Sequence, residues 1–145
     1  MRTLAILLAI SSICYGFDMR CMEKQHLLPV FNECTIEHGG NEHFLVNWLN
    51  LHNSSSDNEK CFRGCVFAKC AFFDNNGMVD AFGPTAIGLI SSNGDVTKAA
   101  KIELAGQLCR RTMTYTNNVC QNSENWTKCM ATHCHDCEFP LSHFQ

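Results

Sequence analysis

This chain of 145 residues has too few basic residues to suggest a nucleic-acid-binding protein. Lysine and arginine number 11 against 14 aspartates and glutamates, which gives a formal net charge of -3. Nucleic-acid binding needs clustered cations that neutralise phosphates, so we expect no nucleic-acid partner. Only 17% of the residues are charged and 46% are hydrophobic. This composition excludes a disordered chain and favours a folded domain.

Long apolar runs are also lacking, apart from a short one at the N-terminus. Arg2 precedes the apolar residues 4–10, a segment too short to cross the roughly 30 Å core of a bilayer as a helix. It is typical of the central part of a secretory signal peptide, and Gly16 is small enough to precede a cleavage site. We therefore predict a signal peptide at residues 1–16 and one domain at residues 17–145. The mature protein is expected to be secreted, extracellular and not embedded in a membrane.

The sequence also lacks complete catalytic and metal-binding motifs. It contains no Gly-x-Ser-x-Gly, and residues 133–137 (His-Cys-His-Asp-Cys) offer one Cys-x-x-Cys without a second half-site for zinc. Residues 74–77 (Asp-Asn-Asn-Gly) resemble part of a calcium loop, but Thr85 stands where a bidentate glutamate is needed. We predict a turn at residues 74–77, no enzyme activity, no cofactor and no metal.

Cysteine, in contrast, is abundant. The chain has eleven cysteines, and so many in a short secreted protein indicate a disulfide framework. Removal of the signal peptide takes away Cys14 and leaves ten, an even number that can pair completely. This parity supports the predicted cleavage.

Apolar residues recur mostly at intervals of three and four, the spacing of a buried helical face. These stripes predict helices within residues 20–38, 44–49, 57–73, 79–90, 95–109 and 123–130. The helix in residues 79–90 is expected to be short or broken, because glycine and proline interrupt it. Asp57, Asp95 and Ser123 are predicted N-caps. No repeat or linker divides the chain, so the sequence predicts one compact all-α bundle of about six helices.

Six of the cysteines follow a spacing that carries functional information. They are Cys34, Cys61, Cys65, Cys109, Cys120 and Cys129, with 26, 3, 43, 10 and 8 residues between them. Cys61 and Cys65 lie four residues apart and therefore share one face of a helix. Together with the signal peptide, size, acidity and helical periodicity, this pattern resembles the insect odorant-binding proteins, the pheromone-binding and general odorant-binding family. The resemblance covers essentially the whole mature chain.

The resemblance implies a disulfide-stapled helical bundle around an apolar cavity. It also implies the pairs Cys34 with Cys65, Cys61 with Cys120, and Cys109 with Cys129. Four further cysteines depart from the six-cysteine pattern, namely Cys21, Cys70, Cys134 and Cys137. We expect them to form extra disulfides that fasten the two termini to the bundle, and three pairings are open. Cys129 is followed by Met130, whereas cysteine-rich members of the family usually have proline there.

The resemblance further implies a carrier whose partner is a small hydrophobic ligand, such as an odorant, a pheromone or another lipid-like molecule. Ten phenylalanines against two tryptophans and two tyrosines can supply an apolar wall with few polar groups that need partners. The candidate lining residues are Phe62, Val66, Phe73, Met78, Phe82, Ile87, Ile90, Leu104, Leu108 and Trp126. Phe139 and Phe144 lie in an apolar tail that either covers the pocket mouth or packs on the surface.

Several alternatives remain open at this point. The runner-up function is a secreted helical interaction protein, in reproductive or venom fluid, on the same scaffold with a filled core. A membrane chemoreceptor is a further candidate partner, and the protein is expected to be a monomer or a homodimer. The histidines near the tail, His133, His135 and His143, motivate the hypothesis of acid-triggered ligand release. Surface histidines without a role are the plainer interpretation.

Two sequons suggest N-glycosylation. Asn53 lies in a serine-rich segment that we expect to be a loop, and we predict that it carries a glycan. Asn125 overlaps a predicted helix start and precedes a tryptophan, so we expect that position to stay unmodified.

Overall fold

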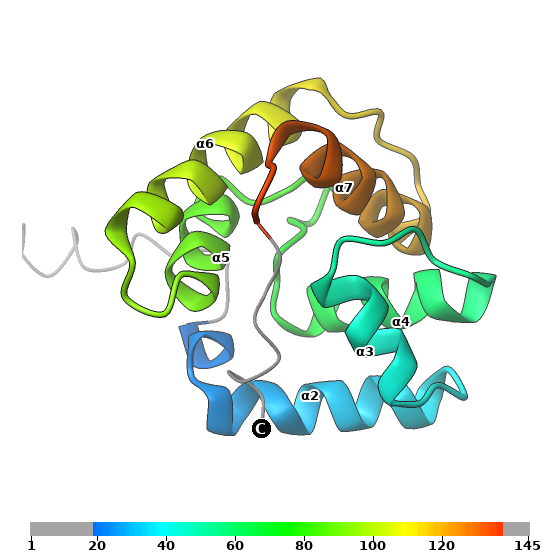
Figure 1. Ribbon diagram of the computed structural model, residues 1–145. Helices are drawn as coiled ribbons and strands as arrows, with labels where there is room; N and C mark the ends of the chain where they lie inside the picture. The colour runs from blue at the N-terminus through cyan, green and yellow to red at the C-terminus, as the bar shows by residue number, and fades with distance from the viewer. Residues whose placement is uncertain (1–18, 138–145) are drawn as a thin grey trace, which may run out of the picture.

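The computed structural model describes residues 19–137, and over that range it contains six α-helices and one short 3-10 helix (Figure 1). In chain order these are η1 (Met19–Met22), α2 (Lys24–Glu37), α3 (Glu42–Leu49), α4 (Asp57–Lys69), α5 (Gly83–Ser91), α6 (Val96–Thr112) and α7 (Val119–His133). The predicted all-α bundle of about six helices is confirmed.

The helices surround a common interior. Helix α5 packs mainly on α6, α4 packs mainly on α7, and α2 runs beneath them against α4 (Figure 1). Within the described residues, no helix combines the length and the apolarity that crossing a membrane would require. The predicted signal peptide and the end of the tail lie outside the described residues.

The predicted helix starts agree with the structure to different degrees. Asp95 caps α6 as expected. Helix α4 is capped by Ser56, so Asp57 is its first residue instead of its cap. The prediction that Ser123 caps the last helix is wrong, because Asn118 caps α7 five residues earlier. Ser123 is instead fully buried inside α7, where α7 packs on α4.

The segment between α4 and α5 forms a turn. Phe73 and Val79 make an isolated antiparallel bridge on either side of residues 74–77. The carboxylate of Asp74 accepts hydrogen bonds from two backbone N–H groups of this turn, at 2.7 and 3.0 Å. Helix α5 begins only at Gly83, so the helix expected within residues 79–90 is confined to the second part of that range.

Five disulfides join the ten cysteines of the described residues. Three of them join Cys34 to Cys65, Cys61 to Cys120, and Cys109 to Cys129. These are the pairs that the family resemblance implies. Helix α4 is thereby linked to α2 through Cys65 and to α7 through Cys61.

The two extra disulfides differ in what they connect. Cys21 pairs with Cys70 and ties η1 to the end of α4, so the N-terminal side is fastened to the bundle as expected. Cys134 pairs with Cys137, only three residues away. The expectation that an extra bridge also fastens the C-terminal side to the bundle is therefore wrong, because Cys134 and Cys137 close a local loop after α7.

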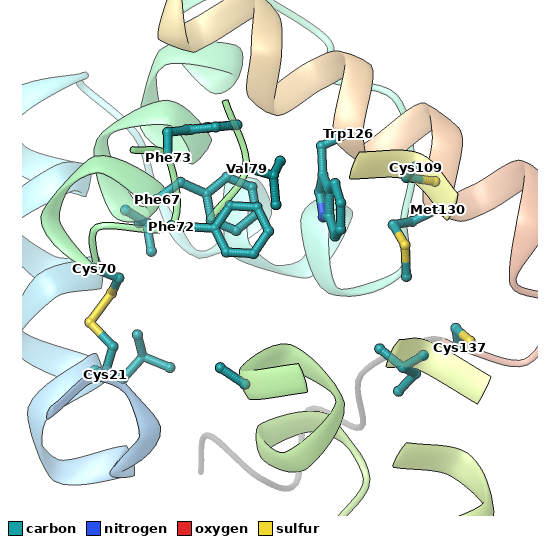
Figure 2. Close-up of a cluster of buried hydrophobic side chains, with 14 of the residues drawn as sticks. Cys21, Phe67, Cys70, Phe72, Phe73, Val79, Cys109, Trp126, Met130 and Cys137 are labelled. Carbon is teal, nitrogen blue, oxygen red and sulfur yellow. A yellow bond between two sulfur atoms is a disulfide. The ribbon is translucent and has the colours of Figure 1, made fainter. Parts of the chain in front are cut away.

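Aromatic rings connect four helices through the core. Phe31 of α2 meets Trp48 of α3 edge-on, with ring centroids 6.3 Å apart, and Trp48 meets Phe67 of α4 at 4.9 Å. Phe67 stacks on Phe72 at 4.2 Å, and Phe72 meets Trp126 of α7 at 4.9 Å. Figure 2 shows Phe67, Phe72 and Trp126 side by side. Ring pairs of this kind stabilise a core beyond the area that they bury.

Candidate functional site

An apolar cavity lies in the interior of the bundle and is bordered by η1 and five helices, α2, α3, α4, α5 and α7. Its volume is about 60 Å³. The cavity is lined by Cys21, Leu27, Phe31, Trp48, Leu49, Leu51, Val66, Phe67, Cys70, Ile87, Ile90, Trp126 and Met130. The indole N–H groups of Trp48 and Trp126 are the only polar side-chain groups among these residues. Such a wall suits a nonpolar molecule.

Figure 2 shows several of the lining residues within the buried core. Phe67 and Trp126 lie on one side, and the disulfide of Cys21 and Cys70 lies across from them. Met130 extends from α7 beside Trp126. Segments far apart in sequence therefore build one site, and disulfides hold two of its walls together.

The cavity is small for a lipid-like ligand. Its volume of about 60 Å³ is less than half of the roughly 150 Å³ that admits benzene in an engineered protein core. A ligand of about ten carbons therefore requires lining side chains to move. Met130 is flexible because its side chain is unbranched, and Leu51 and Ile90 are only half-buried.

Four of the predicted lining residues line the cavity, namely Val66, Ile87, Ile90 and Trp126. Phe62 and Phe73 are buried beside it but belong to the surrounding core, and Phe82 packs half-buried against that core. None of these three phenylalanines contributes to the lining.

Three other candidates face solvent. Met78 is 42% exposed, Leu104 71% and Leu108 37%. Helix α6 turns a different face to the interior, carrying Ile102 and Ala105, so Leu104 and Leu108 are directed outward and do not line the cavity. Phe139 and Phe144 lie outside the described residues.

The sequence did not predict the other nine lining residues. They are Cys21, Leu27, Phe31, Trp48, Leu49, Leu51, Phe67, Cys70 and Met130. Five of the nine lie on α2, α3 and α4. The apolar periodicity of residues 20–38 and 44–49 does mark Leu27, Phe31, Trp48 and Leu49 as buried. That signal does not separate a residue facing a cavity from one facing a neighbouring side chain.

A buried cluster of charges holds the loop that follows α3. Arg63 and Glu59 of α4 are fully buried and Glu124 of α7 is 1% exposed. The Arg63 guanidinium lies 2.7 Å from Oε1 of Glu59 and 3.2 Å from Oε2 of Glu124. Lys128 lies 3.5 Å from Glu124 and balances the second carboxylate. The three buried groups thus link α4 to α7 without leaving a net charge unpaired.

The same carboxylates bind the loop backbone. Ser55 donates from its N–H and its hydroxyl to Glu59, at 2.8 and 2.7 Å. Ser54 donates from its N–H and hydroxyl to Glu124. Burial raises the pKa of Glu59, but the hydrogen bonds from Ser55 and Arg63 outweigh it and hold the pKa below its ordinary value. This loop follows Leu51, so the charge cluster helps to position one cavity wall.

The structure offers no convincing metal-binding cluster among the described residues. Glu37, His38 and Cys65 have ligand atoms within 4.8 Å of one another. The sulfur of Cys65 is bonded to Cys34, and Glu37 is paired with Lys69 at 2.9 Å. Two of the three residues are therefore already engaged.

The two sequons lie in different environments. Asn53 is exposed in the loop between α3 and α4, as expected. Asn125 lies half-buried on α7, and its amide donates to the carbonyl of Thr114 at 2.9 Å. Glycosylation at Asn53 stays a prediction.

These features define the class of protein: a small helical domain, cross-linked by disulfides, with an apolar cavity in its centre. The chain belongs to the PBP/GOBP family, whose family model matches residues 19–133. It is similar in structure to odorant-binding protein dmelOBP28a from Drosophila melanogaster, with a TM-score of 0.63 and 21% sequence identity over 74% of this chain and 88% of that chain. A search of curated proteins gave no match.

Proposed function

We propose that the protein is a secreted carrier that binds a small hydrophobic molecule in the apolar cavity. The observation that carries this proposal is the almost wholly apolar lining of the cavity in a chain of the PBP/GOBP family. A hydrophobic ligand gains roughly 25 cal/mol for each Å² that it removes from water. The lining offers that gain without burying unsatisfied polar groups.

The proposal includes a binding role without catalysis. The cavity lining brings together no nucleophile, general base or carboxylate, which are the groups that hydrolysis or group transfer would use. Secretion follows from the signal peptide proposed at residues 1–16 and from the disulfides, which persist in oxidising compartments. The ligand is then held in extracellular fluid and passed on, with a membrane chemoreceptor as the candidate recipient.

The test is displacement of a fluorescent apolar probe, with variants on α5. Ile90 lines the cavity, whereas its neighbour Leu89 is 52% exposed and does not. Ile90→Trp should fill the cavity and weaken probe binding about tenfold or more, which corresponds to roughly 1.4 kcal/mol. Leu89→Trp should leave the affinity unchanged. No saturable binding by the wild type, or equal loss in both variants, would contradict the proposal.

The small cavity volume of about 60 Å³ favours one second candidate, a secreted helical interaction protein with a nearly filled core. This function predicts no apolar ligand in purified material and no probe binding. Native mass spectrometry distinguishes the two candidates, since a carrier should retain a small molecule whose mass is lost on denaturation. The same spectrum reports whether the protein is a monomer or a homodimer.

A further inference from the structure

A second hollow lies on the outer face of α6. This groove encloses about 570 Å³ and is open to solvent. Leu104 and Leu108 form its apolar floor, and they are 71% and 37% exposed. The groove shares no lining residue with the internal cavity, so it is a separate site.

Basic side chains stand at both ends of the apolar floor. Lys101 and Arg111 line the groove together with His133 and His135 from the end of α7, against one carboxylate, Asp136. Ten residues of helix separate Lys101 from Arg111, which corresponds to about 15 Å. Within residues 19–137, the Lys101 ammonium takes part in no ion pair, and Arg111 uses its Nε for the carbonyl of Gln107 at 3.1 Å. Both cations therefore have donors available for an anion.

The charge of α6 is unusual for this chain. The helix carries Lys98, Lys101, Arg110 and Arg111 against one acidic residue, Glu103, although the chain as a whole has a net charge of -3. Glu103 is engaged by the hydroxyl of Thr85 at 2.7 Å. Of these cations, Lys101 and Arg111 line the groove, whereas Arg110 donates to the carbonyl of Val79 at 2.9 Å. Exposed leucines between Lys101 and Arg111 are complementary to a molecule with an apolar body and a negative head.

We propose that the groove on α6 binds an anionic amphiphile, an alkyl chain that ends in a carboxylate. The chain lies on Leu104 and Leu108, and the carboxylate pairs with Lys101 or Arg111. A hollow of this volume accepts a chain along its length, which favours a single amphiphile over a flat lipid surface. This site goes beyond the proposed cavity function, because it selects for charge where the cavity does not.

Photo-crosslinking locates such a ligand directly. The probe is a twelve-carbon carboxylate with a diazirine near its chain end, and peptides are identified by mass spectrometry. We expect crosslinks on the α6 peptide that carries Leu104 and Leu108. The matching twelve-carbon alcohol should label this peptide about tenfold less, because it lacks the charge-assisted hydrogen bond.

Matched variants separate the groove from general effects of charge and exposure. Lys101→Glu or Arg111→Glu should reduce labelling of α6 by about tenfold, while Lys98→Glu, on the same helix but outside the groove, should not. Leu104→Ser should reduce it similarly, whereas Val96→Ser, at an 81% exposed position outside the groove, should not. Circular dichroism checks that each variant is folded.

Three results would overturn the proposal. They are labelling confined to cavity-lining peptides, equal labelling of α6 in all variants, and equal labelling by the alcohol. A parallel assay uses vesicles of phosphatidylcholine with and without phosphatidylserine. Binding to the anionic vesicles without labelling by the free carboxylate would assign the basic face to a membrane surface instead. Each of these outcomes leaves the proposed cavity function standing, since that function is judged by the variants on α5.

Discussion

At the residue scale, the buried charge cluster was the feature furthest from what the sequence indicates. Glu59 and Arg63 stand four residues apart on α4, a spacing that usually marks an ion pair on an exposed helix face. The structure buries both completely and adds Glu124 from α7. Sequence gives no sign of this burial, because the third member lies 61 residues away from Arg63. Charged residues are rarely buried unless they are paired, so only the packing of α4 on α7 reveals the cluster.

The lowered pKa of Glu59 makes part of the stability depend on pH. Because the folded-state pKa lies below the ordinary value of 4.5, the carboxylate contributes its full stabilisation above about pH 4.5. That contribution is lost as the pH falls through the folded-state pKa. Glu59→Gln should therefore make the free energy of unfolding depend less on pH in the acid range. Near neutral pH the same variant should lower the free energy of unfolding by roughly 3 kcal/mol.

Urea denaturation at several pH values measures this effect. Glu33→Gln is the control, since Glu33 is exposed and pairs with Lys69 at 3.3 Å on the surface. An exposed pair of this kind contributes at most about 1 kcal/mol. If the free energy of unfolding of Glu59→Gln depended on pH as it does in the wild type, the stabilising role of the Glu59 carboxylate would be wrong.

At the scale of helices, the sequence predicted which elements exist better than where they begin and which way they face. Periodicity gave all six α-helices, because each one has to bury an apolar stripe. The position of the Ser123 cap was wrong, since the true cap is Asn118 and the polar residues 121–125 separate Val119 and Cys120 from the apolar stripe of α7. Leu104 and Leu108 were misplaced because α6 is apolar on two faces, and periodicity does not tell which face meets the bundle.

Gly88 lets α5 approach α6 closely. A Cβ on Gly88 would lie 2.7 Å from the backbone oxygen of Ala99, which cannot swing aside as a side chain can. Gly88→Ala should destabilise the fold by about 1 to 3 kcal/mol, since the clash outweighs the better helix propensity of alanine. Thermal or urea unfolding measures the change. Leu89→Ala, at an exposed neighbouring position, is the control and should change the free energy of unfolding by less than about 1 kcal/mol. A Gly88→Ala variant as stable as the wild type would contradict the close approach of Gly88 to the Ala99 backbone.

At the scale of the whole molecule, the extra disulfide between Cys21 and Cys70 cross-links the fold and also forms part of the cavity wall. The pair closes a segment of 49 residues, for which chain entropy gives a stabilisation of about 4 kcal/mol. Both residues also line the cavity. The double variant Cys21→Ser, Cys70→Ser should unfold at a lower temperature and bind the fluorescent apolar probe more weakly, because two hydroxyls replace sulfur in the apolar wall.

A second double variant provides the comparison. Cys134→Ser, Cys137→Ser removes a bridge between residues only three apart, which closes too short a loop to stabilise much. Neither cysteine lines the cavity, so probe affinity should stay at the wild-type level. Equal loss of affinity in the two double variants would show that the Cys21 and Cys70 bridge has no special place in the site.

The presence of a sulfur–sulfur bridge in the cavity wall has a consequence for how the protein is made. The wall of the cavity is complete only after Cys21 and Cys70 are oxidised, so protein produced in a reducing cytosol has an incomplete cavity wall. A ligand screen that fails on such protein would reflect its reduced cysteines and would not test the oxidised protein. Recombinant batches therefore need a free-thiol assay before any panel of volatiles is tried.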